Sequence, residues 1–269
     1  MADYVLARKS RNIASSAVHV LLNILLGMGA VLLTVFSGNP ALGIILVLVS
    51  KWRVVAVRSR YLLTNIKSNL VDIIVGLSIV MLSYYSSIAM TFDQPLDFVY
   101  MAIYMVIYII WLLFIKPMSS ENANLAQSLI AVFLGISAST MISSTIDSAV
   151  MAVMLAFLIG YAACRHVLVQ TEEENFGLTT LVCGLVFAEV AWLSYSWGII
   201  YSFGDSGIRI PQAAIILTIF AFVYNYARQA MIRHRDDFRF KDIIGPVIFG
   251  VLLIGIIVLF FSRPAFNIY

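Results

Sequence analysis

The sequence predicts an all-α protein, a polytopic transmembrane helix bundle, and two observations lead to this class. Of the 269 residues, 62% are hydrophobic and only 12% are charged, whereas a soluble domain carries roughly 25% charged residues. The apolar residues also come in blocks of about 20, the length of a helix that crosses about 30 Å of hydrocarbon. We therefore expect a single integral membrane domain over residues 1–269.

Nine apolar segments are candidate spans. They cover about 13–36, 39–57, 69–90, 98–115, 125–145, 148–164, 178–203, 211–231 and 244–262. The second segment is the weakest, because its apolar core, Ala41–Val49, is too short to cross a bilayer. It must continue through Lys51 and Arg53, whose long side chains can reach the headgroups. The alternative is a re-entrant hairpin, which would reverse the direction of every later segment.

Basic residues decide the orientation, because Lys and Arg collect on the cytoplasmic side of a membrane. With about nine spans and a cytoplasmic N-terminus, all 17 Lys and Arg residues fall in inner segments except Arg209 and Arg263. A re-entrant second segment would place the basic residues of 51–67 outside. The sequence therefore predicts a cytoplasmic N-terminus, an outside C-terminus and residence in the cell membrane. The net charge of +3 reflects this bias and does not indicate nucleic acid.

Motifs for catalysis are lacking. The sequence contains no HExxH, no CxxC, no P-loop and no dinucleotide-binding glycine pattern. We therefore assign no catalytic residue, no metal ligand and no cofactor. Cys164 and Cys183 are interpreted as packing residues, since neither position suits a disulfide or a zinc site.

Glu189 is the most unusual residue of the seventh segment, LVCGLVFAEVAWLSYSWG. A charge near the middle of a span costs roughly 3 kcal/mol, so the side chain should face other helices or water. Asn23 has a similar depth in the first segment, with His19 one turn away, and Thr218 and Asn225 lie in the eighth. We predict an intramembrane polar cluster of these five residues.

Two interpretations of this cluster remain open. The functional one is a binding site that is coupled to protons or sensitive to cations. The structural one is a hydrogen bond that fixes the register of the helices and contributes around 1 kcal/mol.

The stretch KWRVVAVRSRYLLTNIK, residues 51–67, has the pattern of a basic amphipathic helix. At about 100° per residue, its apolar side chains share one arc. The other arc holds Lys51, Arg53, Arg58, Arg60 and Lys67. Such a helix lies in the membrane interface and contacts anionic lipid headgroups or an acidic partner. Because the second span uses some of the same residues, the helix can also begin only near Arg58. The alternative interpretation is a plain topology anchor between the second and third spans.

Small residues mark a close-packing face on the sixth segment. Every fourth position from Ser148 to Cys164 is Ser, Ala, Gly or Cys. This face is expected to contact another helix of the bundle or a second copy of the chain. Tyr104 lies too deep in the fourth segment for an interfacial aromatic belt and therefore needs a hydrogen-bond acceptor.

Three function classes follow. A non-enzymatic scaffold or assembly component of a membrane complex fits the short loops and the missing catalytic motifs. Its partners would be the bilayer and another membrane protein or a second copy. The alternative is a small-solute or lipid transporter that uses the cluster around Glu189. The third class, a lipid-processing enzyme, would need Asp72, Asp242 and His166 to come together at the inner interface.

Overall fold

The computed structural model describes residues 2–89, 95–169, 176–202, 208–233 and 241–261. Helices dominate these ranges. In chain order the elements are α1 (Ala2–Ser37), α2 (Pro40–Ser50), α3 (Trp52–Val55), α4 (Ser59–Ala89), α5 (Pro95–Ile110), η1 (Trp111–Ile115), α6 (Glu121–Ile146), α7 (Ala149–Leu168), α8 (Phe176–Trp197), β1 (Ile200–Ser202), β2 (Arg209–Pro211), α9 (Gln212–Arg233) and α10 (Lys241–Phe261).

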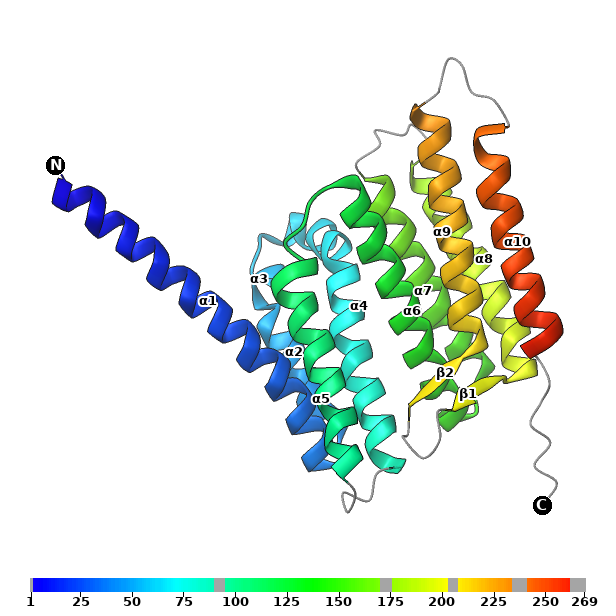
Figure 1. Ribbon diagram of the computed structural model, residues 1–269, viewed down its shortest axis with the longest axis horizontal. Coiled ribbons are helices and arrows are strands. Elements are labelled where there is room, and N and C mark those ends of the chain that lie inside the picture. Colours follow the sequence, from blue (N-terminus) through cyan, green and yellow to red (C-terminus); the bar gives the residue numbers. More distant parts are fainter. Residues whose placement is uncertain (1, 90–94, 170–175, 203–207, 234–240, 262–269) are drawn as a thin grey trace.

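The long helices lie side by side and alternate in direction, so that the bundle has two distinct ends (Figure 1). At one end α4 begins and α5 and α7 finish, close to Lys51, Lys116 and Arg165; we call this the basic end. At the other end β1 pairs antiparallel with β2 in the register Ile200 to Pro211; we call this the hairpin end. The all-α class and the membrane-type composition of the bundle are thus both present.

Eight of the nine predicted segments lie largely within one helix each, whereas the second, 39–57, is divided between α2 and α3. The number of helices suited to crossing a membrane is also smaller than nine. Among the described residues, seven helices are long and apolar enough to cross. Helix α2 has only 11 residues, which extend about 16 Å and fall short of about 30 Å of hydrocarbon. Helix α9, whose second half carries Asn225, Arg228 and Gln229, is also not among the seven found in the described residues.

Local sequence signals set several helix ends. Asn39 caps α2 by accepting a hydrogen bond from the Ala41 amide, and Pro40 occupies the first helical position. Ser148 likewise caps α7. Asp147 ends α6 in the left-handed conformation with φ 52°, a conformation in which Asp is tolerated better than most residues. Since only Asp147 and Ser148 separate α6 from α7, these helices form a tight antiparallel pair.

The small-residue face of α7 packs inside the bundle against α8. Ala156, Gly160 and Cys164 are buried there, and the fully buried ring of Phe187 fills the space above Gly160. Gly184 on α8 is matched in turn by Phe157, whose carbonyl oxygen would lie 3.0 Å from an added Cβ. Of the two contacts expected for this face, the structure shows the one within the bundle.

Tyr104 has the hydrogen-bond partner that its deep position in the span predicts. The side chain is buried on α5, and its hydroxyl lies 2.7 Å from the hydroxyl of Ser86 on α4. A buried phenol without such a partner would lose the hydrogen bond it makes with water in the unfolded chain. The pair therefore helps to fix the register of α5 against α4.

Candidate functional site

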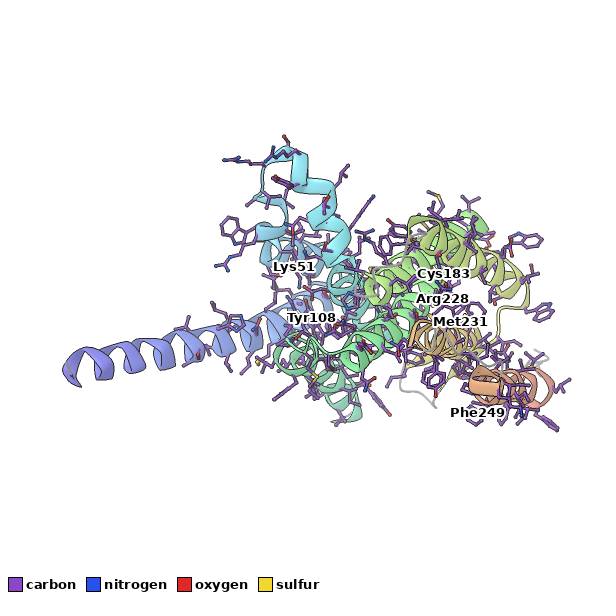
Figure 2. All side chains as sticks on the ribbon, turned by 90° about the horizontal axis from the view of Figure 1, so that it is seen from above. Lys51, Tyr108, Cys183, Arg228, Met231 and Phe249 are labelled. Atoms are coloured by element: carbon purple, nitrogen blue, oxygen red, sulfur yellow. The ribbon has the colours of Figure 1, made fainter. Side chains whose placement is uncertain are left out.

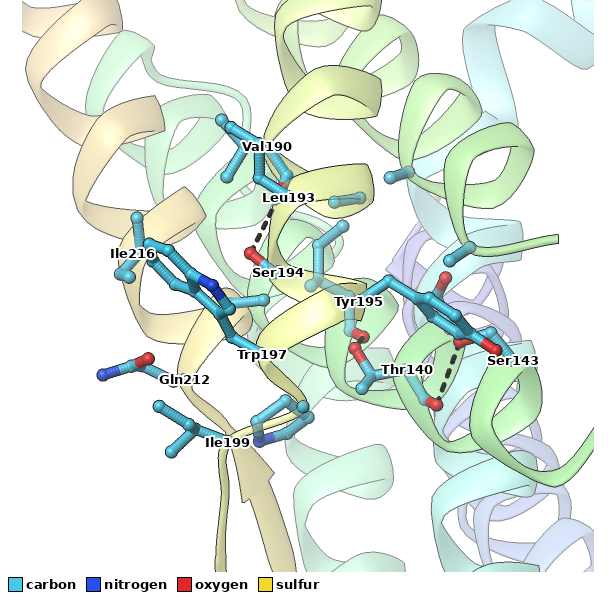
Figure 3. A pocket seen from close by; sticks show the side chains of 18 of the residues that line it. Thr140, Ser143, Val190, Leu193, Ser194, Tyr195, Trp197, Ile199, Gln212 and Ile216 are labelled. Atoms are coloured by element: carbon cyan, nitrogen blue, oxygen red, sulfur yellow. Dashed lines mark hydrogen bonds between the residues drawn. The ribbon is translucent and has the colours of Figure 1, made fainter. Parts of the chain in front are cut away.

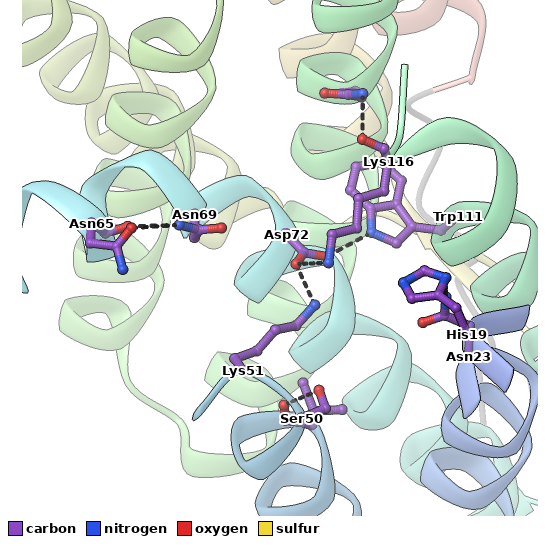
Figure 4. Close-up of polar contacts among 11 residues, drawn as sticks. His19, Asn23, Ser50, Lys51, Asn65, Asn69, Asp72, Trp111 and Lys116 are labelled. Carbon is purple, nitrogen blue, oxygen red and sulfur yellow. Dashed lines mark hydrogen bonds and ion pairs between the residues drawn. The ribbon is translucent and has the colours of Figure 1, made fainter. Parts of the chain in front are cut away.

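The most polar point inside the bundle is the carboxylate of Asp72 on α4, near the basic end. The residue is 8% exposed. One carboxylate oxygen accepts hydrogen bonds from the ammonium groups of Lys51 and Lys116, the latter at 2.8 Å. The other oxygen accepts a hydrogen bond from the indole nitrogen of Trp111 at 3.0 Å. Figure 4 shows these side chains converging from three segments of the chain. We call this group the Asp72 site.

Two local features bring the donors to Asp72. Helix α2 stops at Ser50, so that Lys51 in the connection to α3 can turn toward α4. Helix α5 continues into the wide π-turn η1, in which the Lys116 amide donates to the Trp111 carbonyl at 2.8 Å. In a regular α-helix residues five apart point about 140° away from each other. The π-turn places Trp111 and Lys116 on the same side of the helix, and such turns are frequent at functional sites.

The electrostatics of the Asp72 site depend on the buried lysine. Lys51 is 7% exposed, whereas the side chain of Lys116 is 42% exposed. Burial lowers the pKa of Lys51 to about 8, although the charge of Asp72 raises it and that of Lys116 lowers it further. Lys51 therefore stays charged at neutral pH because Asp72 is beside it. The site carries two positive charges and one negative charge, which suits a structural clamp better than a cation site.

Gln127 on α6 extends the polar contacts across the basic end. Its side-chain nitrogen donates to the carbonyls of Ile115 and Met118 at 2.7 and 3.0 Å, where η1 ends. Its side-chain oxygen lies 2.7 Å from a ring nitrogen of His166 on α7. His166 is thus paired with Gln127 and not with Asp72, and the side chain of Asp242 lies outside the described residues. Among the described residues no three His, Cys, Asp or Glu side chains form a metal-binding group.

The structure does not bring the predicted polar cluster together. His19 and Asn23 pair with each other at 3.1 Å on α1, which packs against α2, α4, α5 and η1. Thr218 donates to the carbonyl of Ala214 within α9 at 2.6 Å, and Asn225 is buried further along the same helix. Glu189 belongs to α8, which packs against α7 and α9.

Glu189 lies on the outer surface of the bundle. It is exposed, whereas Ala188 and Ala191 beside it are buried against the rest of the bundle. Its neighbours on the same side of α8 are the exposed Leu178, Val182, Leu185 and Trp192. We call these five residues the α8 face. Glu189 is about 20 Å from the start and about 12 Å from the end of this 22-residue helix.

The predicted interfacial helix over 51–67 is instead a corner between two helices. Helix α3 ends at Val55, and α4 begins at Ser59. Asn65 on α4 ties the two together by donating to the Val54 carbonyl at 2.7 Å. Lys51 lies inside the Asp72 site and does not reach the surface. The other four predicted basic residues, Arg53, Arg58, Arg60 and Lys67, are exposed.

This α3–α4 corner combines its basic residues with exposed apolar ones. Trp52, Val55 and Leu63 are each at least 60% exposed. The guanidinium of Arg60 lies 4.4 Å from the centre of the Tyr61 ring. Seen from above in Figure 2, the corner projects from the bundle with Lys51 at its base. The composition predicted for a membrane-surface element is therefore retained, although the single helix is not.

Replacing Asp72 tests the Asp72 site. We expect Asp72→Asn to lower the free energy of unfolding by about 3 kcal/mol or more, because it leaves a buried ammonium uncompensated. The exposed Lys116 should matter much less, and Lys116→Met should cost about 1 kcal/mol at most. The measurement is denaturant unfolding of the purified chain in a neutral detergent.

A double substitution separates charge from packing in the same experiment. Asp72→Asn combined with Lys51→Met removes the unpaired charge, so that it should recover part of the lost stability. Equal losses for Asp72→Asn and Lys116→Met, or no recovery in the double variant, would contradict the role given to the buried pair.

Comparison with known proteins provides no family for this chain. No protein-family model matches it, and neither the curated proteins nor the solved structures include a match. The features from which a function can be argued are therefore the Asp72 site, the α8 face and the α3–α4 corner.

Proposed function

We propose that this chain is a non-enzymatic component of a complex in the cell membrane, and that it binds its partner through the α8 face. The observation that supports this proposal is the exposed position of Glu189 on an apolar helix of spanning length. In hydrocarbon an uncovered carboxylate at such a depth costs roughly 3 kcal/mol. A partner that covers Glu189 removes this cost.

The chemistry of the α8 face indicates what kind of partner it fits. Its five residues, Leu178, Val182, Leu185, Glu189 and Trp192, are three or four positions apart and so form one stripe along the helix. A transmembrane helix that packs along this stripe would bury the large apolar side chains. An Arg, Lys, amide or hydroxyl group at the depth of Glu189 would donate a hydrogen bond to it.

A scaffold role agrees with the surroundings of Glu189 better than a transport role does. A transport site would place the acid in an internal cavity between helices. A cavity of the described bundle at the hairpin end is lined by Val190, Ala191 and Ser194 of α8, and Glu189 is not among its lining residues. The acid points away from the helices that a transported solute would pass.

Photocrosslinking in native membranes tests the α8 face. A photoreactive amino acid at Leu185 should give a discrete adduct, and Glu189→Leu should remove that adduct without reducing the amount of folded chain. The folded state should persist because Glu189 is exposed in the bundle. Leu252 on α10 is the matched control position, since it is 59% exposed against 55% for Leu185.

The mass of the adduct distinguishes the kinds of partner. An adduct of twice 29.9 kDa would identify a second copy of the chain, and any other discrete mass would identify a different protein. The proposal fails if the adduct at Leu185 survives Glu189→Leu, or if position 252 yields the same adduct.

We also propose that the α3–α4 corner contacts anionic lipid headgroups. Each Lys or Arg near an anionic surface contributes about 1 kcal/mol, and the exposed Trp52 and Leu63 can enter the interface as apolar anchors. The corner would thus hold the basic end of the bundle at the membrane surface.

Lipid binding by the purified chain tests the corner. The variant Arg53→Gln/Arg58→Gln/Arg60→Gln should lose most of its retained phosphatidylglycerol in native mass spectrometry, because three exposed charges are removed. Arg209→Gln at the hairpin end serves as the control and should retain it. Equal retention by both variants would mean that the corner is only a topology anchor.

A further inference from the structure

A cavity lies at the hairpin end of the bundle, between α6, α7, α8, α9 and α10 and next to the β1–β2 hairpin. Its volume is about 470 Å³, within the range of about 300–1,000 Å³ found for small-molecule sites. Figure 3 shows Thr140, Ser143 and Tyr195 on one side of it and Trp197, Gln212 and Ile216 on the other. None of the residues discussed so far as functional lines this cavity.

One wall of the cavity carries hydroxyl groups that already donate their protons to backbone carbonyls. Thr140 donates to the carbonyl of Ile136 at 2.9 Å, and Ser143 donates to that of Thr140 at 3.1 Å. Ser194 on α8 donates to the carbonyl of Val190 at 2.7 Å. A hydroxyl that donates within its own helix still has lone pairs that can accept. This wall therefore offers acceptors to a ligand.

The charged residues that line the cavity also favour a positively charged ligand. Asp147 lines its rim, and the residues that line it include no Lys, Arg or His. The Tyr195 hydroxyl donates to one oxygen of Asp147 at 2.8 Å, which leaves the second oxygen for a ligand. Helices α6 and α8 both end at this cavity, and the C-terminal end of a helix carries a partial negative charge. The starts of α7 and α9 at the same cavity oppose this, although Ser148 caps α7. The sign preference therefore rests on Asp147 and on the acceptor hydroxyls.

The opposite wall is apolar and aromatic. Ile216 on α9 and Ile254 and Val258 on α10 form an aliphatic surface, and the Trp197 indole also lines the cavity. Indole and phenol rings attract cations over their faces. A ligand that suits the whole cavity needs a positive or donor-rich group for one wall and a hydrocarbon part for the other.

We infer that this cavity binds an organic ammonium compound with an apolar body. The ammonium group would lie near Asp147 and the acceptor hydroxyls, with the Trp197 ring on its other side. The hydrocarbon part would lie against Ile216 and Ile254. An anion of the same size is disfavoured, because nothing positive lines the described cavity.

Calorimetric titration of the purified chain in a neutral maltoside detergent tests this inference. The probes are hexylammonium, whose N–H groups can donate to the acceptor wall, hexyl sulfate and hexyl glucoside, which share one chain and differ in charge. We expect the ammonium probe to bind and the sulfate not to bind. Asp147→Asn should weaken the ammonium probe by about tenfold, since it removes a charged partner.

Two further variants test whether the ammonium probe binds in this cavity. Glu121→Gln removes an exposed acid at the other end of α6 and should leave the ammonium affinity unchanged. Ile216→Trp fills the cavity and should abolish binding while the chain keeps its helical circular dichroism. The inference is overturned if hexyl sulfate binds as well as the ammonium probe, if Asp147→Asn has no effect, or if no probe binds.

Discussion

The Asp72 carboxylate is the constraint on which the first half of the bundle depends. It is buried on α4 and is contacted by Lys51, Lys116 and Trp111. Losing the buried Lys51 or Trp111 leaves a charge or a polar group with too few partners in a medium of low dielectric. The short α2, the π-turn η1 and the position of α4 are therefore mutually dependent. Helix α2 must end where Lys51 can reach Asp72, and α5 must widen for Trp111 and Lys116 to share it.

Much of the fold follows from the sequence because apolar length and capping are local properties. Eight of the nine predicted segments lie largely within one helix each, and Tyr104, which was expected to need a hydrogen-bond partner, bonds to Ser86. The prediction that 51–67 forms one amphipathic helix failed at Ala56–Arg58, where α3 gives way to α4. A single helical wheel over 51–67 places Lys51 beside the other basic residues. The break between α3 and α4 instead allows Lys51 to turn inward to Asp72.

The sequence contains a signal for the outward direction of the Glu189 side chain. Gly184, Ala188 and Ala191 mark the side of α8 that packs, and all three are buried. At about 100° per residue, Glu189 points at least about 100° away from each of them. A small-residue face beside an acid therefore indicated an outward acid. The π-turn left no such signal, because the wide turn of Trp111–Ile115 depends on contacts with Asp72 that are 39 residues away in the chain.

The two ends of the bundle differ in a way that bears on transport. The basic end gathers ammonium and guanidinium groups, whereas the cavity at the hairpin end presents acceptors and Asp147. A cation would therefore enter from the hairpin end. One turn deeper than the cavity lining, Val132, Phe187 and Leu217 are fully buried on α6, α8 and α9. These side chains fill part of the core between the cavity and the basic end. The α8 residues that line the cavity, Val190, Ala191 and Ser194 among them, are distinct from those of the α8 face.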